Sequence, residues 1–362
     1  MASARFSFAI LSLLSFFTCH FVTAAPHLFK RSVQVDGHAS LMGTNGTYPR
    51  ATYLNDGTLL GCYTAKRGTQ VGLNVVQSTD NGTSWNDQGS ATFEDQETHG
   101  LDNCYLHQLP DSDRILMAFR NHERDPEINH YVKHIMLVYY SDDKGKTWEY
   151  LSTVATTNTT GLGLWEPFVM DKLNGDLVLF FSRETRTDGK DQDSSLIHST
   201  DAGKTWENET IISGGDIQKR DGMLGVARLA PGSEKMIAVF ESLMDNTGIT
   251  SITSSDDGNT WSKERGSVYR GSGTPTEAAP QVVLVGKTLV ASFSTWEDGK
   301  DKGTDQPNVK VVTSTDGGVN WGEKTLVQED CHWAGEVVID ESSLLVMCQH
   351  DTDLIARRVT IS

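Results

Sequence analysis

The octapeptide Ser141-Asp-Asp-Lys-Gly-Lys-Thr-Trp148 decides the fold, because it recurs along the chain. Further copies begin at Ser78, Ser199, Ser254 and Ser314, and all five follow the pattern Ser-x-Asp-x-Gly-x-x-Trp. The aspartates of successive copies are 63, 58, 55 and 60 residues apart. Five matches at a near-constant spacing indicate a repeated structural unit, which must be recognised before any other feature is interpreted.

Each copy is typical of the tip of a β-hairpin. The Asp side chain can accept hydrogen bonds from backbone N–H groups of its own turn, and Gly supplies a positive φ. The Trp side chain can then pack back over the strands. Because turn chemistry repeated once per unit is structural, we do not expect these residues to be catalytic.

A second repeated element lies between the octapeptides, where two short apolar strands flank a turn. It occurs six times: Pro49–Leu54 with Thr58–Tyr63, Cys104–Leu109 with Ile115–Arg120, Pro167–Met170 with Leu177–Ser182, Leu224–Leu229 with Met236–Glu241, Pro280–Val285 with Leu289–Thr295, and Ala334–Ile339 with Leu344–Gln349. Asn-Asp-Gly and Asn-Gly-Asp at these turns favour hairpins. Six units of four strands predict an all-β, six-bladed propeller.

The sixth unit ends at Ser362 with only about three strands and no octapeptide. Residues Ser32–Asp36 alternate as a strand does and precede the first unit. We therefore expect this N-terminal segment to supply the missing outer strand and close the ring, which removes exposed strand edges. The propeller domain is predicted over residues 32–362.

The N-terminus is typical of a secreted protein. Residues 1–24 have one early charge, an apolar run and small residues before the expected cleavage site, which predicts a signal peptide rather than a membrane anchor. Residues 25–31 end in Lys30-Arg31, so they are either a short pro-segment or an ordinary charged start to the domain. The net charge of −17 argues against nucleic acid as a partner. We expect an extracellular monomer that does not bind membranes.

Cysteines and glycosylation sequons agree with secretion. Four cysteines follow the signal segment; Cys331 and Cys348 flank one predicted hairpin, which favours their pairing and leaves Cys62 for Cys104. Acceptor sequons stand at four asparagines, which are Asn45, Asn81, Asn158 and Asn208.

Propeller topology predicts which residues meet. In each blade the first strand starts, and the second ends, on the same face, whereas the octapeptide turns lie on the opposite face. Candidate substrate-binding residues on the first face are Arg50, Tyr105, Arg120, Trp165, Arg183, Arg220, Asp221, Trp296 and Trp333. Of eight tryptophans, five belong to the octapeptides and the other three fall in this set. Aromatic rings beside charged groups suit a sugar, which offers an apolar C–H face and hydroxyl groups.

Two carboxylates in this region are candidate catalytic groups. Glu166 lies between Trp165 and Pro167, and Glu241 ends the apolar strand Met236–Glu241. Because they belong to neighbouring blades, both can face one glycosidic bond, as acid/base and nucleophile or as acid and water-activating base. The sequence has no metal-ligand, phosphate-loop or serine-elbow motif, so we expect no cofactor and no metal.

The octapeptide resembles the Asp-box, or bacterial neuraminidase repeat, of the sialidase superfamily. The segments Leu164-Trp-Glu-Pro-Phe-Val-Met170, Arg220-Asp-Gly-Met223 and Val239-Phe-Glu241 further resemble fungal glycoside hydrolase family 93. That family comprises secreted exo-arabinanases, which release arabinobiose from α-1,5-L-arabinan with retention. The resemblance implies that Glu166 is the acid/base and Glu241 the nucleophile.

Exo-sialidase activity is an alternative. Tyr48-Pro-Arg50 resembles the region with the first arginine of the sialidase triad, but sialidases use a late tyrosine as nucleophile and this chain has no Tyr after Tyr269. A second alternative is a carbohydrate-binding propeller without catalysis. We expect a secreted, exo-acting, retaining glycoside hydrolase that acts on an oligo- or polysaccharide.

Overall fold

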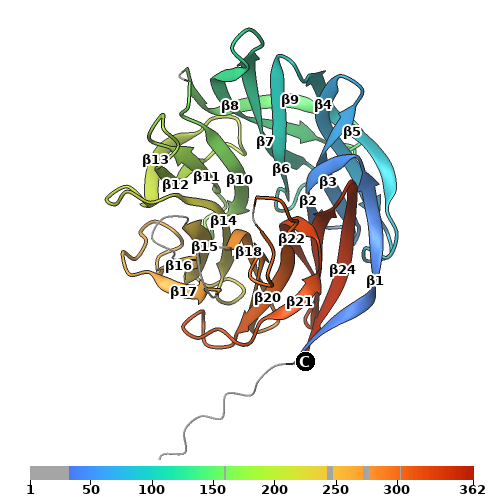
Figure 1. Cartoon of the computed structure of the whole chain (residues 1–362), viewed down its shortest axis with the longest axis vertical. Coiled ribbons are helices and arrows are strands. Elements are labelled where there is room, and N and C mark those ends of the chain that lie inside the picture. The colour runs from blue at the N-terminus through green and yellow to red at the C-terminus, as the bar shows by residue number, and fades with distance from the viewer. Residues whose placement is uncertain (1–31, 159, 243–247, 272–276, 302) are drawn as a thin grey trace, which may run out of the picture. The chain divides into compact units, whose positions relative to one another are not determined.

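The computed structural model describes residues 32–362, apart from 159, 243–247, 272–276 and 302. The predicted signal peptide (1–24) and the segment 25–31 lie outside the described residues. In the described part, every regular element is a β-strand, and the strands form six four-stranded antiparallel sheets around a central axis (Figure 1). No helix long and apolar enough to cross a bilayer occurs in this part of the chain. The predicted six-bladed, all-β propeller is therefore confirmed.

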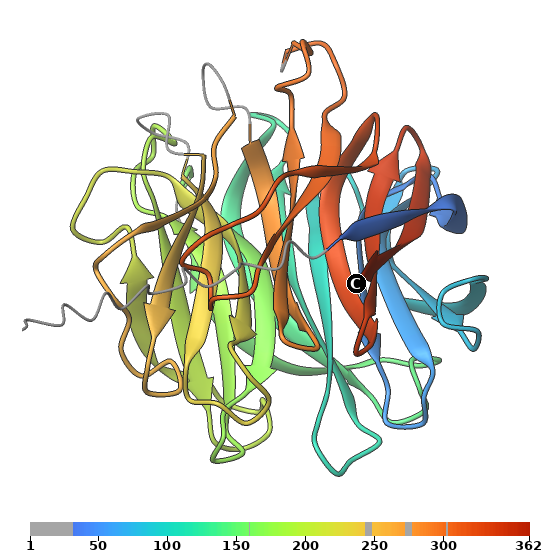
Figure 2. The same cartoon turned by 90° about the horizontal axis from the view of Figure 1, so that it is seen from below.

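Each of the first five blades is built from four strands that are consecutive in the sequence. Blade 1 is β2 (Gly46–Tyr53), β3 (Leu59–Arg67), β4 (Gln70–Ser78) and β5 (Asn86–Asp95); blade 2 is β6 (His99–Gln108), β7 (Ile115–Asp125), β8 (His130–Ser141) and β9 (Glu149–Thr157). Blade 3 is β10 (Leu164–Asp171), β11 (Leu177–Glu184), β12 (Gln192–Ser199) and β13 (Glu207–Ser213); blade 4 is β14 (Asp221–Arg228), β15 (Met236–Ser242), β16 (Gly248–Ser254) and β17 (Gly266–Tyr269). Blade 5 is β18 (Glu277–Val285), β19 (Thr288–Thr295), β20 (Asn308–Ser314) and β21 (Thr325–Gln328). The strands run between two loop-bearing faces (Figure 2).

Blade 6 closes the ring with strands from both ends of the domain. It contains β22 (Cys331–Asp340), β23 (Ser343–His350) and β24 (Asp353–Ile361), and its outer strand is β1 (Val33–Thr44). β1 pairs antiparallel with β24 from Val33 opposite Ile361 to Thr44 opposite Asp353. The predicted N-terminal closing strand is confirmed, and it continues beyond the predicted segment to Thr44.

The octapeptides form the predicted turns. In the second copy, Asp143 accepts hydrogen bonds from the backbone N–H of Lys146 (3.0 Å) and Thr147 (2.9 Å), and Gly145 has a φ of 84°. The Trp148 indole N–H donates to the Gly145 carbonyl (3.0 Å). These contacts satisfy the turn's own polar groups, which confirms a structural role.

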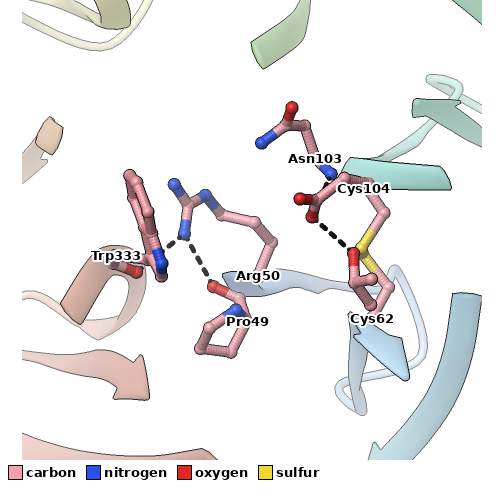
Figure 3. The surroundings of a disulfide bond; sticks show 8 residues. Pro49, Arg50, Cys62, Asn103, Cys104 and Trp333 are labelled. Atoms are coloured by element: carbon pink, nitrogen blue, oxygen red, sulfur yellow. Dashed lines mark hydrogen bonds between the residues drawn. A yellow bond between two sulfur atoms is a disulfide. The ribbon is translucent and has the colours of Figure 1, made fainter. Parts of the chain in front are cut away.

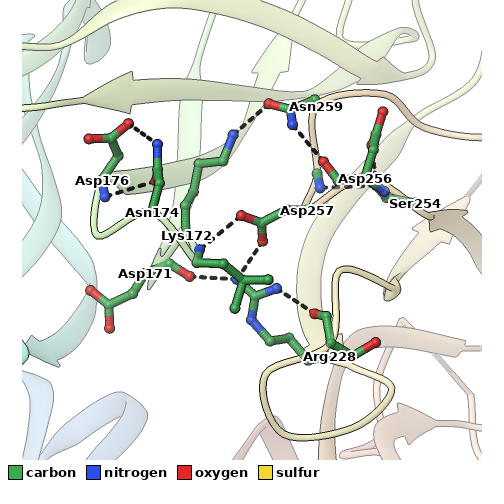
Figure 4. Close-up of polar contacts among 12 residues, drawn as sticks. Asp171, Lys172, Asn174, Asp176, Arg228, Ser254, Asp256, Asp257 and Asn259 are labelled. Atoms are coloured by element: carbon green, nitrogen blue, oxygen red, sulfur yellow. Dashed lines mark hydrogen bonds and ion pairs between the residues drawn. The ribbon is translucent and has the colours of Figure 1, made fainter.

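Octapeptide turns also connect neighbouring blades. Asp257, in the fourth copy, forms an ion pair with Arg228 (2.6 Å) and accepts the backbone N–H of Leu173 in blade 3 (2.8 Å). Lys172 donates from Nζ to the Asn259 side chain (2.6 Å), as Figure 4 shows. The face opposite the candidate site is thus held together by polar contacts as well as by apolar packing.

Both predicted disulfides are present. Cys62 of β3 is bonded to Cys104 of β6, which joins blades 1 and 2 (Figure 3). Cys331 of β22 is bonded to Cys348 of β23 within blade 6. Apolar clusters fill the spaces between blades; one packs Phe180 of blade 3 against Phe240 of blade 4. Disulfides and core together fix the positions of the inner strands.

Candidate active site

The inner strand of every blade has a β-bulge near its start. One residue in each of these strands has a φ between 50° and 58°, and each lies within a shift of the strand register. The six residues are Tyr48, Asn103, Glu166, Met223, Ala279 and Trp333. A positive φ is uncommon for residues other than glycine, and bulges at equivalent places re-aim side chains. The candidate acid Glu166 is therefore one member of a ring of six bulged residues.

The bulged residues meet near the axis. Tyr48, Met223 and Ala279 are buried in one apolar cluster, against which Trp333 packs. Because these residues come from four different blades, the cluster lies where the inner strands converge. The repeated bulge thus builds a common floor from segments far apart in the sequence.

A cavity of about 330 Å³ lies over this floor. Its lining residues are Trp165, Glu166, Gln192, Arg220, Met223, Glu241, Ala278, Ala279, Ser294, Trp296, His332 and Trp333. The structure thus brings together six of the predicted site residues: both glutamates, the three tryptophans outside the octapeptides, and Arg220. The volume is at the lower end of the range for small-molecule sites.

Glu166 is held in an environment that favours its protonated form. Its carboxyl group is partly buried, and Oε2 is a buried atom without a hydrogen-bond partner in the described residues. Burial, followed by the nearby charge of Glu241, raises the pKa of Glu166 to about 8, although Ser182, Arg120 and Arg220 act in the opposite direction. A carboxyl group with this pKa carries a proton at neutral pH, as a general acid requires.

Ser182 connects Glu166 to the next blade. This fully buried residue of β11 hydrogen-bonds to Glu166, and its Oγ accepts the backbone N–H of the bulged residue Met223 (3.0 Å). Because the hydroxyl accepts from Met223, its own proton is free to point at Glu166. The bulge in blade 4 therefore orients the candidate acid in blade 3.

Glu241 occupies the corresponding place one blade further on. It lies opposite Gly222 in β14, just as Ser182 lies opposite Trp165 in β10. Its Oε2 accepts the backbone N–H of the bulged residue Ala279 (2.9 Å). A backbone donor stabilises the ionised form of a carboxylate. One position of the blade repeat thus carries a hydroxyl in blade 3 and a carboxylate in blade 4.

Three tryptophans line the cavity. Trp165 has the Arg120 guanidinium over its ring at 4.8 Å from the centroid. Trp296 donates its indole N–H to the Asp305 carbonyl (2.9 Å). Trp333 stacks on His332, with centroids 5.9 Å apart. These contacts fix the rings, which can then pack against C–H faces of a saccharide.

Arg220 is the arginine of the cavity lining. One of its guanidinium nitrogens donates to Glu184 (3.0 Å) and to the Gly189 carbonyl (2.7 Å). Its charge lowers the pKa of Glu166, so it opposes the effect of burial. The guanidinium is therefore positioned by blade 3 and acts electrostatically on the candidate acid.

Two predicted binding residues lie deeper along the axis instead of lining the cavity. Arg50 stacks over the Tyr48 ring (3.8 Å to the centroid) and donates to the Pro49 carbonyl (2.8 Å) and the Trp333 carbonyl (3.1 Å), as Figure 3 shows. Tyr105 packs on Phe168 and lines a second cavity of about 310 Å³ that contains none of the site residues above except Tyr105. Strand-end position alone does not reveal how far a side chain lies down the axis.

Three further predicted binding residues are engaged elsewhere. Arg183 pairs with Asp193 (3.3 Å) and Glu209 in blade 3. Asp221 is completely buried and pairs with Arg265. Arg120 lies behind Trp165 and pairs with Asp102 (3.1 Å). These three side chains are absent from the lining of the cavity that contains the glutamates, and their role in substrate binding stays a prediction.

Sequence reasoning missed Ser182, Gln192, Met223, Ala279 and His332. A signal for the bulge does exist, since Tyr48, Glu166 and Ala279 each precede a proline. Proline disfavours the right-handed helical conformation of the preceding residue and lacks the N–H that a regular ladder needs. The recurrence of X-Pro at the start of an inner strand could have marked the ring.

The four asparagines of the sequons are all exposed, as glycosylation would require. Their modification remains a prediction.

Known proteins place this geometry in context. A family model described as BNR/Asp-box repeat matches residues 139–150, and a search of curated proteins finds no match.

An α-L-arabinofuranosidase from Fusarium graminearum, solved with an iminosugar inhibitor, is 22% identical, with 89% of this chain and 97% of that chain covered and a TM-score of 0.69. An α-L-arabinanase from Penicillium chrysogenum, complexed with arabinobiose, is 20% identical, with coverage of 91% and 98% and a TM-score of 0.69. The Hadza microbial sialidase is 16% identical, with coverage of 87% and 65% and a TM-score of 0.62. The chain thus carries a BNR/Asp-box repeat and is similar in fold to an α-L-arabinofuranosidase, an α-L-arabinanase and a sialidase.

Proposed function

We propose that this protein is a secreted, exo-acting, retaining glycoside hydrolase that releases arabinobiose from α-1,5-L-arabinan. The observation that carries the proposal is the pairing of Glu166 and Glu241 in one aromatic cavity, where Glu166 is poised to be protonated and Glu241 accepts a backbone N–H. Fold similarity to an arabinanase that binds arabinobiose supports the choice of sugar. The two disulfides are consistent with secretion.

In the first step, Glu166 donates its proton to the leaving glycosidic oxygen while the C1–O bond breaks. Glu241 attacks C1 and forms a covalent glycosyl ester. In the second step, the Glu166 carboxylate takes a proton from water, whose oxygen attacks C1. The ester bond breaks, Glu241 regains its charge, and the sugar leaves. Trp165, Trp296 and Trp333 would bind the apolar faces of the sugar. The positive charge of Arg220 would favour the ionised form of Glu166.

The cavity composition disfavours sialidase chemistry. Its described lining contains one arginine, Arg220, and no tyrosine, whereas sialidases use an arginine triad and a tyrosine nucleophile. Arg50 and Arg183 have partners elsewhere. The electrostatic requirement for holding a sialic acid carboxylate beside the reacting carbon is therefore not met by the lining.

A substrate panel tests the proposal. Purified protein is incubated with debranched arabinan, linear arabino-oligosaccharides and sialyllactose, and the products are identified by chromatography. We expect arabinobiose to accumulate from the start of the reaction, and the E241Q variant, purified identically, to release none. Release of sialic acid, or no product from any glycan, would refute the assignment.

A further inference from the structure

A larger cavity, of about 720 Å³, lies between blades 1 and 2 on the same face as the glutamates. It neighbours the catalytic cavity, since Arg120 lines the larger one and stacks at 4.8 Å on Trp165, which lines the smaller one. A saccharide that extends past Trp165 would therefore enter the larger cavity. Nothing in the proposed reaction uses this space.

The charged groups of the larger cavity favour an anion. Its lining has three cations, Lys66, Arg120 and Arg124, against two carboxylates, Glu97 and Asp102, in a chain of net charge −17. Arg120 and Asp102 form an ion pair with each other (3.1 Å), so their charges largely cancel. Glu97 is exposed. Lys66 and Arg124 then remain against Glu97, so the lining keeps an excess of one positive charge.

Arg124 is oriented by neutral groups only. Its guanidinium donates to the Asn129 side chain (3.2 Å) and to the Tyr131 hydroxyl (3.0 Å), and it lies 4.7 Å from the Tyr131 ring centroid. Its Nε is buried without a hydrogen-bond partner in the described residues. A guanidinium that is fixed by neutral groups, with no carboxylate partner among the described residues, can bind a carboxylate.

The neighbouring tyrosine reports the same positive potential. Burial acts to raise the pKa of Tyr131, but Arg120 and Arg124 lower it, and the pKa is lowered overall. Lys66, near the end of β3, is exposed and also lines the cavity. Thr47, Gln96 and Asn129 add uncharged polar groups that could bind hydroxyls.

We propose that this cavity binds the carboxylate of an acidic sugar within the same oligosaccharide, through Arg124 and Lys66. The inference rests on the proposed function for the neighbouring catalytic cavity, and it specifies the substrate further: a neutral sugar is cleaved, and a single acidic sugar lies beyond Trp165. A polyanion would be repelled by the net charge of the chain, whereas one carboxylate is accommodated locally.

Binding measurements test this proposal independently of hydrolysis. The probes are a glucuronate-containing disaccharide and 3′-sialyllactose, which represent the two common sources of a sugar carboxylate, each paired with its carboxyl-reduced, neutral form. Isothermal titration calorimetry compares wild type, K66Q, R124Q and the double variant. K235Q is the matched control, because it removes an exposed lysine from a turn on the opposite face.

At least one acidic probe is expected to bind at least tenfold more tightly than its neutral form. This preference for the acidic form is expected to fall as the salt concentration is raised. R124Q and K66Q each reduce that preference, the double variant abolishes it, and K235Q leaves it unchanged. The probe with the larger preference identifies the acidic sugar. Equal affinity for acidic and neutral forms of both probes would overturn the proposal, as would a preference that survives the double substitution in a folded variant. Because this assay measures binding and the substrate panel measures product release, failure of the hydrolase proposal would be seen separately.

Discussion

At the scale of single residues, the important feature is the protonation of Glu166. Burial raises the pKa of this carboxyl group, and the nearby charge of Glu241 adds to the effect. The residue type was visible in the sequence, but its pKa was not, because that property depends first on burial and on the approach of Glu241 from another blade. The ion-pair partners of Arg183 and Asp221 could not be identified from strand position for the same reason.

The alkaline limb of the pH profile should report Glu166. If Glu166 must be protonated in the free enzyme, kcat/KM falls above about pH 8. Ser182→Ala removes a hydrogen bond that favours the ionised form, so the pKa rises and the limb moves about one pH unit upward. A limb that stays in place in this variant would contradict the role of Ser182.

Because the Met223 N–H also loses its partner in Ser182→Ala, we expect destabilisation of about 1–3 kcal/mol, which thermal unfolding measures.

Glu166 should also make the free energy of unfolding depend on pH. Its pKa is raised from 4.5 to about 8 on folding, so the folded state binds the proton more tightly than the unfolded state. Stability from this group is complete below about pH 4.5 and is lost as the pH rises toward 8. Glu166→Gln removes this dependence, so its Tm relative to wild type should increase from pH 5 to pH 8. A constant Tm difference across this range would show that the carboxyl group is not held in the protonated form.

At the scale of elements, hairpin tips and bulged inner strands have separate tasks. The tips were predictable because turn chemistry is local: Ser, Asp, Gly and Trp recur at fixed offsets. The bulges were not predicted, since alternation of apolar residues does not reveal a shift in register. They nevertheless place Glu166 and supply the N–H groups of Met223 and Ala279 to Ser182 and Glu241.

Asp143 tests the structural role of the tips. Asp143→Ala leaves the N–H groups of Lys146 and Thr147 without their acceptor, which should lower the free energy of unfolding by about 1–3 kcal/mol. The adjacent Asp142→Ala is the control; it removes only an exposed pair with Arg114 and should cost under about 1 kcal/mol. Chemical denaturation measures both. Since the tips lie on the face away from the glutamates, a large loss of kcat in folded D143A would argue against this division of tasks.

At the scale of the whole propeller, closure of the ring brings distant segments to one cavity. The residues that line this cavity lie between positions 165 and 333 of the sequence. β1 completes the blade that carries His332 and Trp333. The repeat period made this architecture predictable. The depth of each side chain along the axis was not predictable, which explains why Arg50 and Tyr105 were assigned to the cavity and lie elsewhere.

Removal of β1 tests the importance of closure. Deleting residues 32–44 exposes the edge of β24, so we expect a lower Tm and concentration-dependent association. Size-exclusion chromatography and circular dichroism measure both effects. A truncated protein that remains monomeric with an unchanged Tm would show that the closing strand is dispensable.

The most direct test of the catalytic pair is azide rescue of E166A and E241A with an aryl α-1,5-L-arabinobioside that carries an activated leaving group, with product configuration determined by NMR. The acid/base variant E166A should give an azide product of retained α configuration, because Glu241 still forms the ester. E241A should give the inverted β product, because azide replaces the missing nucleophile. Near-normal turnover in either variant without azide, or the same anomer from both, would contradict the assignment of these two roles.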